Sequence, residues 1–285
     1  MIISYISGGL GNQLFQYATG RCLADLNNTE LKLDVSSFES YQLRNFDLNA
    51  FNLRASFATP GEITRLIPSH NFEKAFQYLS PLKKRKYYRE KYFHFDDAVL
   101  KLGMDVYLKG YFQSEKYFLP IKEKLRNDFS IKKEKPGIAG EFKSQLRDKN
   151  SIAVHIRRGD FSKDDITMHY HGTLPADYYH HAIRLIQSKL PNPHFYFFSD
   201  DIQWVKENLQ VPGAVYVSGE ITKNHIEDLY LMSQCRHNII ANSSFSWWGA
   251  WLNNNPDKIV IAPKKWFNKG PKDTQDLIPE GWIKI

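Results

Sequence analysis

From residue 151 onward the chain alternates short apolar runs with amphipathic helical segments, and this alternation constrains its fold more than any other feature. The apolar runs predict strands, and the segments between them have the periodicity of helices. Strands that alternate with helices are typical of parallel βαβ units, so we expect a Rossmann-like second half. The predicted strands cover residues 151–157, 194–198, 214–218, 238–241 and 258–262, and the predicted helices cover residues 175–190, 201–209, 225–235 and 244–254.

The first half of the chain begins in a similar way. Residues 1–6 predict a buried strand, residues 8–13 form a glycine-rich turn, and apolar residues then recur at i, i+4 spacing from Leu14 to Leu26. A strand, a glycine turn and a helix in this order direct backbone N–H groups at a phosphate. The same glycines also fit a tight turn that needs a positive φ angle. Both readings stay open for this loop on the sequence alone.

Polar residues follow the strand predicted at 151–157. His155, Arg157, Arg158 and Asp160 stand where this strand ends, and ligands of open parallel sheets lie beyond the carboxyl ends of the strands. An arginine guanidinium can hold two oxygens of one phosphate. Adjacent residues of a strand point to opposite faces, so we expect one arginine to face a ligand and the other to pair with a carboxylate. A structural ion pair is the alternative.

Three further groups follow predicted strands or begin predicted helices. Ser243 and Ser244 begin a helix and can hold a diphosphate oxygen, or they are a plain N-cap. Asp228 can accept hydrogen bonds from a guanine edge, or it is a first-turn helix acid. For the Asp200–Asp201 pair we favour a helix N-cap over a metal–diphosphate site. Tryptophans at helical spacing, Trp247, Trp248 and Trp251, are expected in the core.

The net charge of +7 favours anionic partners. Basic and aromatic residues alternate over 83–94, a composition that fits single-stranded nucleic acid or an anionic membrane surface. We favour a solvated loop and strand whose aromatic residues face the core. Two distant cysteines, Cys22 and Cys235, are expected to be buried thiols. Without a signal-like segment or a membrane-spanning run, the sequence predicts a cytoplasmic protein, with peripheral contact at the inner membrane as an alternative.

Several stretches together resemble the alpha-1,2-fucosyltransferase family, glycosyltransferase family eleven, in its bacterial-type soluble form. They are Gly8–Tyr17, with the sequence GGLGNQLFQY, His155–Asp160, with HIRRGD, and Asn242–Leu252, with NSSFSWWGAWL. Residues 110–118 and 263–267 fit the same family. The resemblance covers almost the whole chain in order.

This resemblance implies an α/β, GT-B-like fold with two Rossmann-like domains and the nucleotide-sugar site in the cleft between them. The expected boundaries are an N-terminal acceptor-side α/β domain at 1–135, a linker region at 136–150 and a C-terminal GDP-fucose-binding domain at 151–285. The implied reaction is inverting transfer of L-fucose from GDP-fucose to the 2-hydroxyl of a galactose-terminated glycan. No metal or other cofactor is expected. A donor such as GDP-mannose, or a non-enzymatic nucleic-acid or membrane-surface protein, is the alternative.

The resemblance also assigns roles. Guanine would be addressed by His155 and Asp228, and the β-phosphate by Arg157. The predicted donor-binding set is Gly9, Gly11, Asn12, His155, Arg157, Arg158, Asp228, Ser243 and Ser244. An acceptor hydroxyl benefits from a general base. Asp160 is the first candidate base or else orients Arg158, and Asp165 or Asp164 is the second candidate.

Overall fold

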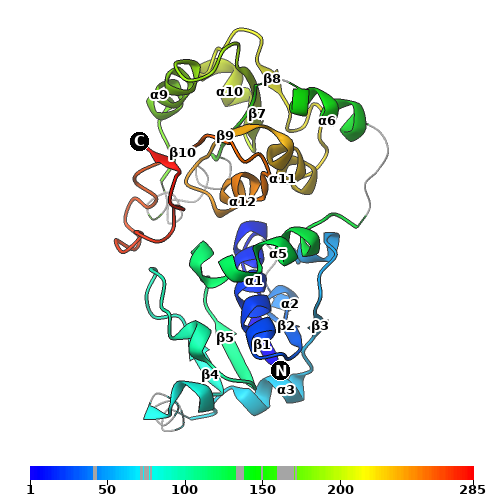
Figure 1. The fold of residues 1–285 in the computed structure, drawn as a ribbon, viewed down its shortest axis with the longest axis vertical. Helices are drawn as coiled ribbons and strands as arrows, with labels where there is room; N and C mark the ends of the chain where they lie inside the picture. The colour runs from blue at the N-terminus through cyan, green and yellow to red at the C-terminus, as the bar shows by residue number, and fades with distance from the viewer. Residues whose placement is uncertain are drawn as a thin grey trace. The chain divides into compact units, whose positions relative to one another are not determined.

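The computed structural model describes two compact units, each built on a parallel sheet (Figure 1). The first unit comprises Met1–Lys133 and Asp273–Pro279, and the second comprises Glu134–Lys272 and Glu280–Ile285. The structure describes residues 1–40, 44–70, 73, 77, 79–132, 138–148, 150–158, 170 and 172–285. Two parallel sheets in one α/β chain confirm the predicted fold class.

The sheet of the first unit has the strand order β3-β2-β1-β5-β4. All four pairings are parallel. Its strands are β1 (Ile2–Tyr5), β2 (Leu31–Asp34), β3 (Ser56–Phe57), β4 (Tyr87–Arg89) and β5 (Val106–Lys109). The accompanying helices are α1 (Leu10–Leu26), α2 (Ser37–Ser40), α3 (Pro60–Leu66) and α5 (Lys122–Asp128), with short 3₁₀ turns at 48–50, 82–84, 99–101, 115–117 and 119–121.

Helix α1 is almost entirely buried, but its last residue is not. Leu14 is fully buried, whereas Leu26 is 53% exposed. Residues four apart turn by about 40° more than a full turn of an α-helix, so an i, i+4 row drifts around the helix over its length. The row of apolar residues that predicted the helix therefore leaves the buried face at Leu26. At the start of α3, Thr59 and Glu62 form a reciprocal capping box.

The second unit carries the order β11-β10-β9-β6-β7-β8, and its pairings are parallel as well. Its strands are β6 (Ser151–Ile156), β7 (His194–Ser199), β8 (Val215–Tyr216), β9 (His237–Ile239), β10 (Val260–Ala262) and β11 (Ile283–Lys284). The helices are α6 (Ile138–Asp148), α9 (Ala176–Gln187), α10 (Ile202–Asn208), α11 (His225–Gln234) and α12 (Ser244–Leu252). Strands β3 and β11 were not predicted, because neither lies in a longer apolar run of the sequence.

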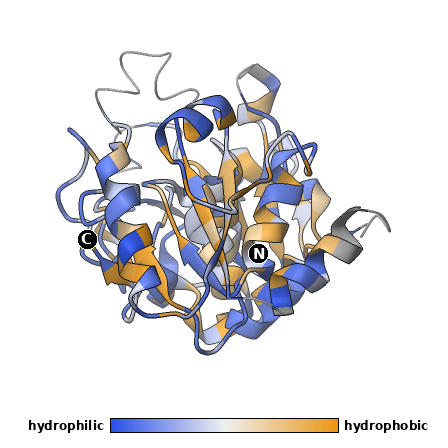
Figure 2. Cartoon of the chain, turned by 90° about the horizontal axis from the view of Figure 1, so that it is seen from above, coloured by the Kyte–Doolittle hydropathy of each residue, from blue (hydrophilic) through white to orange (hydrophobic). Residues whose placement is uncertain are grey.

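Strand β6 lies at the centre of this second sheet, and its alternate residues face different helices. Ile152, Val154 and Ile156 pack in one apolar cluster with residues of α9 and α10. Burying each such side chain contributes roughly 1.5–3 kcal/mol. By the two-residue period of a strand, His155 and Arg157 point to the opposite face. In Figure 2 the strands are mostly orange, which is the hydrophobic end of its scale.

The chain returns to the first unit before it ends. Asp273 accepts hydrogen bonds from the backbone N–H groups of Phe93 (2.9 Å) and His94 (3.2 Å), and it lies 2.9 Å from His94 Nδ1. Asp276 accepts a bond from the Phe95 N–H at 3.0 Å and pairs with Lys116. These contacts fasten residues 273–279 to the loop that follows β4.

Both cysteines and the tryptophans lie where the sequence predicted. Cys22 and Cys235 are buried free thiols. Trp247 and Trp248 are fully buried, and Trp251 is 2% exposed. The rings of Trp247 and Trp248 meet edge to face at 5.0 Å. These tryptophans therefore belong to the core.

Candidate functional site

The carboxyl edge of the second sheet brings together polar groups from four strand ends. Because β9, β6, β7 and β8 are parallel neighbours, the residues that follow them share this edge. They include Arg157 after β6, Asp200 after β7, Ser218 after β8 and Ser243 after β9. The donor-binding residues predicted at strand ends of the second half therefore lie along one edge of the second sheet, whereas Gly9, Gly11 and Asn12 belong to the first unit.

The two arginines have different surroundings, and both pair with carboxylates. Arg157 Nε lies 3.3 Å from Asp200 Oδ2. Arg158 Nε lies 3.9 Å from Asp201 Oδ2, and its guanidinium stacks 4.0 Å above the Trp204 ring. The expectation that only one arginine pairs with a carboxylate was wrong, because each of the two aspartates after β7 pairs with one of the arginines. The stack on Trp204 places Arg158 on the face of α10, opposite to His155.

The Asp200–Asp201 pair acts as we favoured from the sequence. Asp201 is the N-cap of α10 and accepts a hydrogen bond from the Trp204 N–H at 3.1 Å. Asp200 accepts a hydrogen bond from the Arg158 N–H at 2.8 Å in addition to its ion pair. The pair thus caps a helix and holds the strand end. Among the described residues, no cluster of three or more His, Cys, Asp or Glu side chains could hold a metal ion.

His155 is a buried imidazole at the end of β6. It is 4% exposed, and its Nδ1 has no hydrogen-bond partner among the described residues. Burial, together with the charge of Arg157, lowers the pKa of His155 to about 3, so the ring is neutral at physiological pH. Its ring lies 5.4 Å from the Phe245 ring, which lies 6.4 Å from the His225 ring. The Phe245 contact joins β6 to the start of α12.

Asp228 lies in the first turn of α11 and is held by two hydroxyl groups. Ser218 Oγ donates to Asp228 Oδ2 at 2.8 Å, and Thr222 Oγ1 donates to Asp228 Oδ1. Ser218 Oγ also accepts a hydrogen bond from the Ser199 N–H at 3.0 Å, which connects the carboxylate to the end of β7. Burial raises the pKa of Asp228, and the two hydroxyl donors act against that shift. Each carboxylate oxygen keeps a lone pair for a further donor.

Helix α12 begins at this edge with an N-terminus suited to an anion. Ser243 is its N-cap and accepts a hydrogen bond from the Phe245 N–H at 3.3 Å. The first turn contains no acidic residue that would offset the positive end of the helix dipole. Ser244 is partly exposed beside it. The N-cap reading of Ser243 is confirmed, and it is compatible with an anion at the free N–H groups of the same turn.

The glycine loop of the first unit is held in place by side-chain amides. Gly8 has a φ of +76°, which favours glycine. Gln13 Nε2 donates to the carbonyl oxygens of Gly8 (2.9 Å) and Asn45 (2.8 Å), and Gln113 Nε2 donates to Asn12 Oδ1 at 2.7 Å. Gly9 is the N-cap of α1 and brings no capping side chain.

The sequence missed one cation near this loop. A Cβ placed on Gly9 would lie 3.9 Å from Arg44 Nε, so this guanidinium stands beside the start of α1. Asn12 lies in the first turn of α1, and Gly11 is buried there. No local pattern marks Arg44, because it lies in a mixed segment with no periodicity.

The candidate general bases predicted from the sequence, Asp160, Asp164 and Asp165, lie outside the described residues. The structure adds Phe245, His225, Ser218 and Thr222 to the neighbourhood of His155 and Asp228. Of these, Phe245 lies within the family motif at 242–252. No pattern in the sequence marks Ser218 or Thr222 as a residue of the site.

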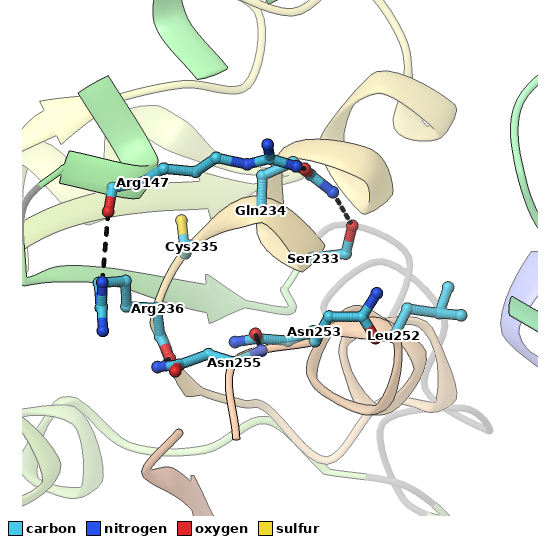
Figure 3. Close-up of a pocket in the computed structure, with 9 residues that line it drawn as sticks. Arg147, Ser233, Gln234, Cys235, Arg236, Leu252, Asn253 and Asn255 are labelled. Atoms are coloured by element: carbon cyan, nitrogen blue, oxygen red, sulfur yellow. Dashed lines mark hydrogen bonds between the residues drawn. The ribbon is translucent and has the colours of Figure 1, made fainter. Parts of the chain in front are cut away.

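A separate hollow of about 290 Å³ lies in the second unit (Figure 3). Arg147 Nη2 donates to Gln234 Oε1 at 2.8 Å, and Arg236 Nη1 approaches the Arg147 carbonyl oxygen at 3.5 Å. Arg236 precedes β9 and its N–H donates to Ser151 Oγ, at the start of β6, so the hollow is at the amino edge of the sheet. Its lining residues are Arg147, Ser233, Gln234, Cys235, Arg236, Leu252, Asn253, Asn254 and Asn255. It is therefore distinct from the candidate site.

Comparisons with known proteins identify the family of the chain. The family model described as glycosyl transferase family 11 matches residues 1–285. The chain is 34% identical to an alpha-1,2-colitosyltransferase of Escherichia coli, over 100% of this chain and 99% of that protein. It is 26% identical to the galactoside alpha-(1,2)-fucosyltransferase 1 of Homo sapiens, over 99% of this chain and 74% of that protein.

A solved structure shows the same fold. It is that of the NodZ alpha-1,6-fucosyltransferase soaked with GDP-fucose, with a TM-score of 0.51 and 15% identity over 88% of this chain and 91% of that one. Together with the match of the family model over the whole chain, these findings establish the fold and the reaction class. The chain is a glycosyltransferase and belongs to glycosyl transferase family 11.

Proposed function

We propose that this protein moves L-fucose from GDP-fucose to the 2-hydroxyl of a terminal galactose on an oligosaccharide, with inversion at the anomeric carbon. The observation that carries the proposal is the carboxyl edge of the second sheet, where Arg157, the start of α12 and the braced Asp228 lie together. A guanidinium and a helix N-terminus suit a diphosphate, and a carboxylate suits the N–H edge of guanine.

Transfer of a fucosyl group develops positive charge at the anomeric carbon and negative charge on the departing GDP. Groups that are already oriented toward the growing charge stabilise the transition state more than the bound substrate. In this proposal Arg157 receives that charge on the β-phosphate, and Asp200 keeps its guanidinium in place at 3.3 Å. The N–H groups that begin α12, next to Ser243 and Ser244, share the charge.

In this proposal His155 and Asp228 bind the guanine base of the donor. The buried, neutral imidazole of His155 has an Nδ1 without a hydrogen-bond partner among the described residues, which supports a role of this nitrogen toward the guanine base. Asp228 accepts from guanine with the lone pairs that Ser218 and Thr222 leave free. In the first unit, we propose that Gly9, Gly11 and Asn12 present the N–H groups of α1 to an anion, with Arg44 beside them.

A second donor follows from the relative named alpha-1,2-colitosyltransferase. Colitose is fucose without its 3-hydroxyl, and both sugars would be carried by GDP. A site that hydrogen-bonds the 3-hydroxyl rejects the deoxy sugar strongly, whereas an apolar site discriminates weakly. The nucleotide-binding groups above serve either donor, so the choice between fucose and colitose rests on contacts to the sugar.

The experiment that tests the proposal is a transfer assay with the full chain. GDP-fucose, GDP-colitose and GDP-mannose are each offered with a panel of β-galactosides, and the product linkage is determined by NMR. We expect an α-1,2-linked fucosyl galactoside and little mannosyl transfer. Addition of EDTA should leave the rate nearly unchanged, because fixed positive charge serves the diphosphate. Preferred transfer from GDP-colitose would mean that GDP-colitose, and not GDP-fucose, is the donor. Transfer from none of the three would refute the proposal.

A further inference from the structure

The basic segment at 83–94 is not used by the proposed donor site, and the structure separates it into two ends. Lys83, Lys84 and Lys86 precede β4, so they lie at the amino edge of the first sheet. Tyr92 follows β4, at the carboxyl edge. These three lysines and the exposed aromatic ring of this segment are therefore at opposite ends of a strand, and Lys91 lies at the same end as the ring.

Two large apolar side chains accompany the lysines at the amino edge. Leu79 is 86% exposed and Met104 is 61% exposed, the highest values among the large apolar residues that the structure describes. A Cβ on Gly103 would lie 2.3 Å from the Lys83 carbonyl oxygen, so only glycine allows these two loops to touch. That contact puts Met104 next to Lys83. We call Leu79, Lys83, Lys84, Lys86 and Met104 the amino-edge patch.

Leu79 is held near the lysines by a compact turn. Arg85 Nε donates to the Ser80 carbonyl oxygen at 2.9 Å, and the Lys84 N–H donates to the Pro81 carbonyl oxygen at 2.8 Å. The Lys86 backbone N–H donates to Gln77 Oε1 at 2.8 Å. The turn therefore presents an exposed leucine and the lysines from one short segment.

The charge of this edge is positive. Lys83, Lys84 and Lys86 form no ion pair within the described part of the chain. The nearby acid, Asp105, is outnumbered by cations, because its carboxylate lies 3.0 Å from the Met1 ammonium and 3.8 Å from Arg65 Nη2, and the charge of Lys86 also lowers its pKa. An exposed apolar pair rimmed by an excess of cations is complementary to an anionic lipid surface.

The aromatic rings argue against single-stranded nucleic acid at this place. Tyr87 is stacked on Tyr107 with a centroid distance of 5.9 Å, and Tyr88 is 4% exposed. Tyr88 is therefore closed to a base and one face of Tyr87 is covered by Tyr107, whereas sequence-tolerant binding of single strands depends on stacking with free ring faces. Tyr92 does expose its ring, but at the other edge, roughly 10 Å or more along the strand direction.

We propose that the amino-edge patch docks the first unit on an anionic membrane surface, with Leu79 and Met104 entering the interface and the three lysines contacting lipid phosphates. This inference goes beyond the proposed transfer reaction and does not depend on it. The partner is the bilayer surface itself and not a free phosphate, because separated lysines on an exposed edge do not enclose a single anion, whereas the apolar pair requires an apolar phase.

The test is co-sedimentation of the full chain with vesicles of phosphatidylcholine alone or mixed with phosphatidylglycerol. We expect binding only to the anionic vesicles, with weakening as salt rises. Lys83→Glu/Lys84→Glu should lower the partition coefficient by at least roughly thirtyfold, which corresponds to about 1 kcal/mol for each lysine. Leu79→Ser/Met104→Ser should weaken binding while leaving its salt dependence in place.

The matched control is Lys189→Glu/Lys269→Glu, which changes the net charge equally at exposed positions of the second unit. It should bind within about twofold of the unchanged protein. Equal loss in the control would show that net charge alone acts, and would overturn the patch. Absence of vesicle binding by the unchanged protein, or binding of a labelled oligothymidine that needs Lys83 and Lys84, would also overturn it. Unchanged thermal midpoints of the variants establish that they are folded.

Discussion

The hydroxyl of Ser218 donates to Asp228 at 2.8 Å and, with its own oxygen, receives the Ser199 N–H at 3.0 Å. One small side chain thereby fixes the orientation of a partly buried carboxylate relative to the end of β7. Thr222 holds the other carboxylate oxygen. This brace determines which directions Asp228 offers to a ligand.

Removing the brace should weaken nucleotide binding. Ser218→Ala and Thr222→Val each remove one hydrogen bond to Asp228, and each should lower GDP affinity by roughly tenfold, the effect of one bond to a charged group. Thr222→Ser, which keeps the hydroxyl, should restore it. These donors also lower the pKa of Asp228, so this pKa should be higher in both variants. As the pH falls, both variants should therefore release GDP at a higher pH than the unchanged protein does.

Isothermal titration with GDP and IDP checks this prediction. Ser233→Ala is the matched control, since Ser233 lies in the same helix and its hydroxyl donates to the Tyr230 carbonyl oxygen instead. IDP lacks the exocyclic amino group, so the preference for GDP over IDP should shrink in the brace variants. An unchanged preference would contradict a role of Asp228 at the base.

Substitution of Arg157 should affect catalysis, whereas substitution of Arg158 should affect stability. Arg157→Ala should lower kcat/KM by about a hundredfold or more without changing the thermal midpoint, as the loss of one charge-stabilising group does. Arg158→Ala should instead destabilise the second unit by about 1 kcal/mol, because it loses the stack on Trp204. Steady-state kinetics and thermal melts of both variants decide. Full turnover by Arg157→Ala would remove it from the site.

His155 should make the second unit sensitive to acid. Its pKa is lowered from 6.5 to about 3 in the folded protein, so between these values the unfolded chain binds a proton that the folded chain does not. Stability contributed by the neutral ring is therefore present above about pH 6.5 and declines as the pH falls toward 3, with a slope of at most about 1.4 kcal/mol per pH unit. His155→Gln should flatten this part of a plot of thermal midpoint against pH. An unchanged slope would mean that other groups cause the acid sensitivity.

A general base should be visible in the pH–rate profile. Asp160→Asn and Asp165→Asn are compared, because the acceptor hydroxyl loses a proton during transfer. The variant that lacks the base should lose roughly a hundredfold in kcat and the acidic limb of the profile together. Near-normal kcat in both variants would mean that neither aspartate is the base.

Local patterns were sufficient for most elements of the fold. The helix observed as α9 buries Tyr179, Ala182, Ile183 and Ile186, the residues whose spacing predicted one apolar face. Asp201 caps α10, and Thr59 and Glu62 form their capping box, because capping involves residues only three or four positions apart. Such signals are contained within one turn of the chain and need no knowledge of the tertiary fold.

Contacts between segments that are distant along the chain could not be predicted from the sequence. Ser218 and Thr222 reach Asp228 only because a loop after β8 folds back on α11, and a serine or threonine in a loop has many ordinary roles. The return of residues 273–279 to the first unit depends in the same way on Asp273 and its partners at 93–94.

By itself the sequence determined the parallel α/β second half, the strand that ends in His155 and Arg157, and the family motifs whose resemblance implied the two-domain fold, since periodicity, caps and short motifs are local. Only the tertiary structure decided how those groups are partnered. It assigned Asp200 to Arg157 and Asp201 with Trp204 to Arg158. It also divided the basic segment between two edges of a sheet. The physical reason is that hydrogen bonds, ion pairs and exposure depend on which residues the strand order makes neighbours.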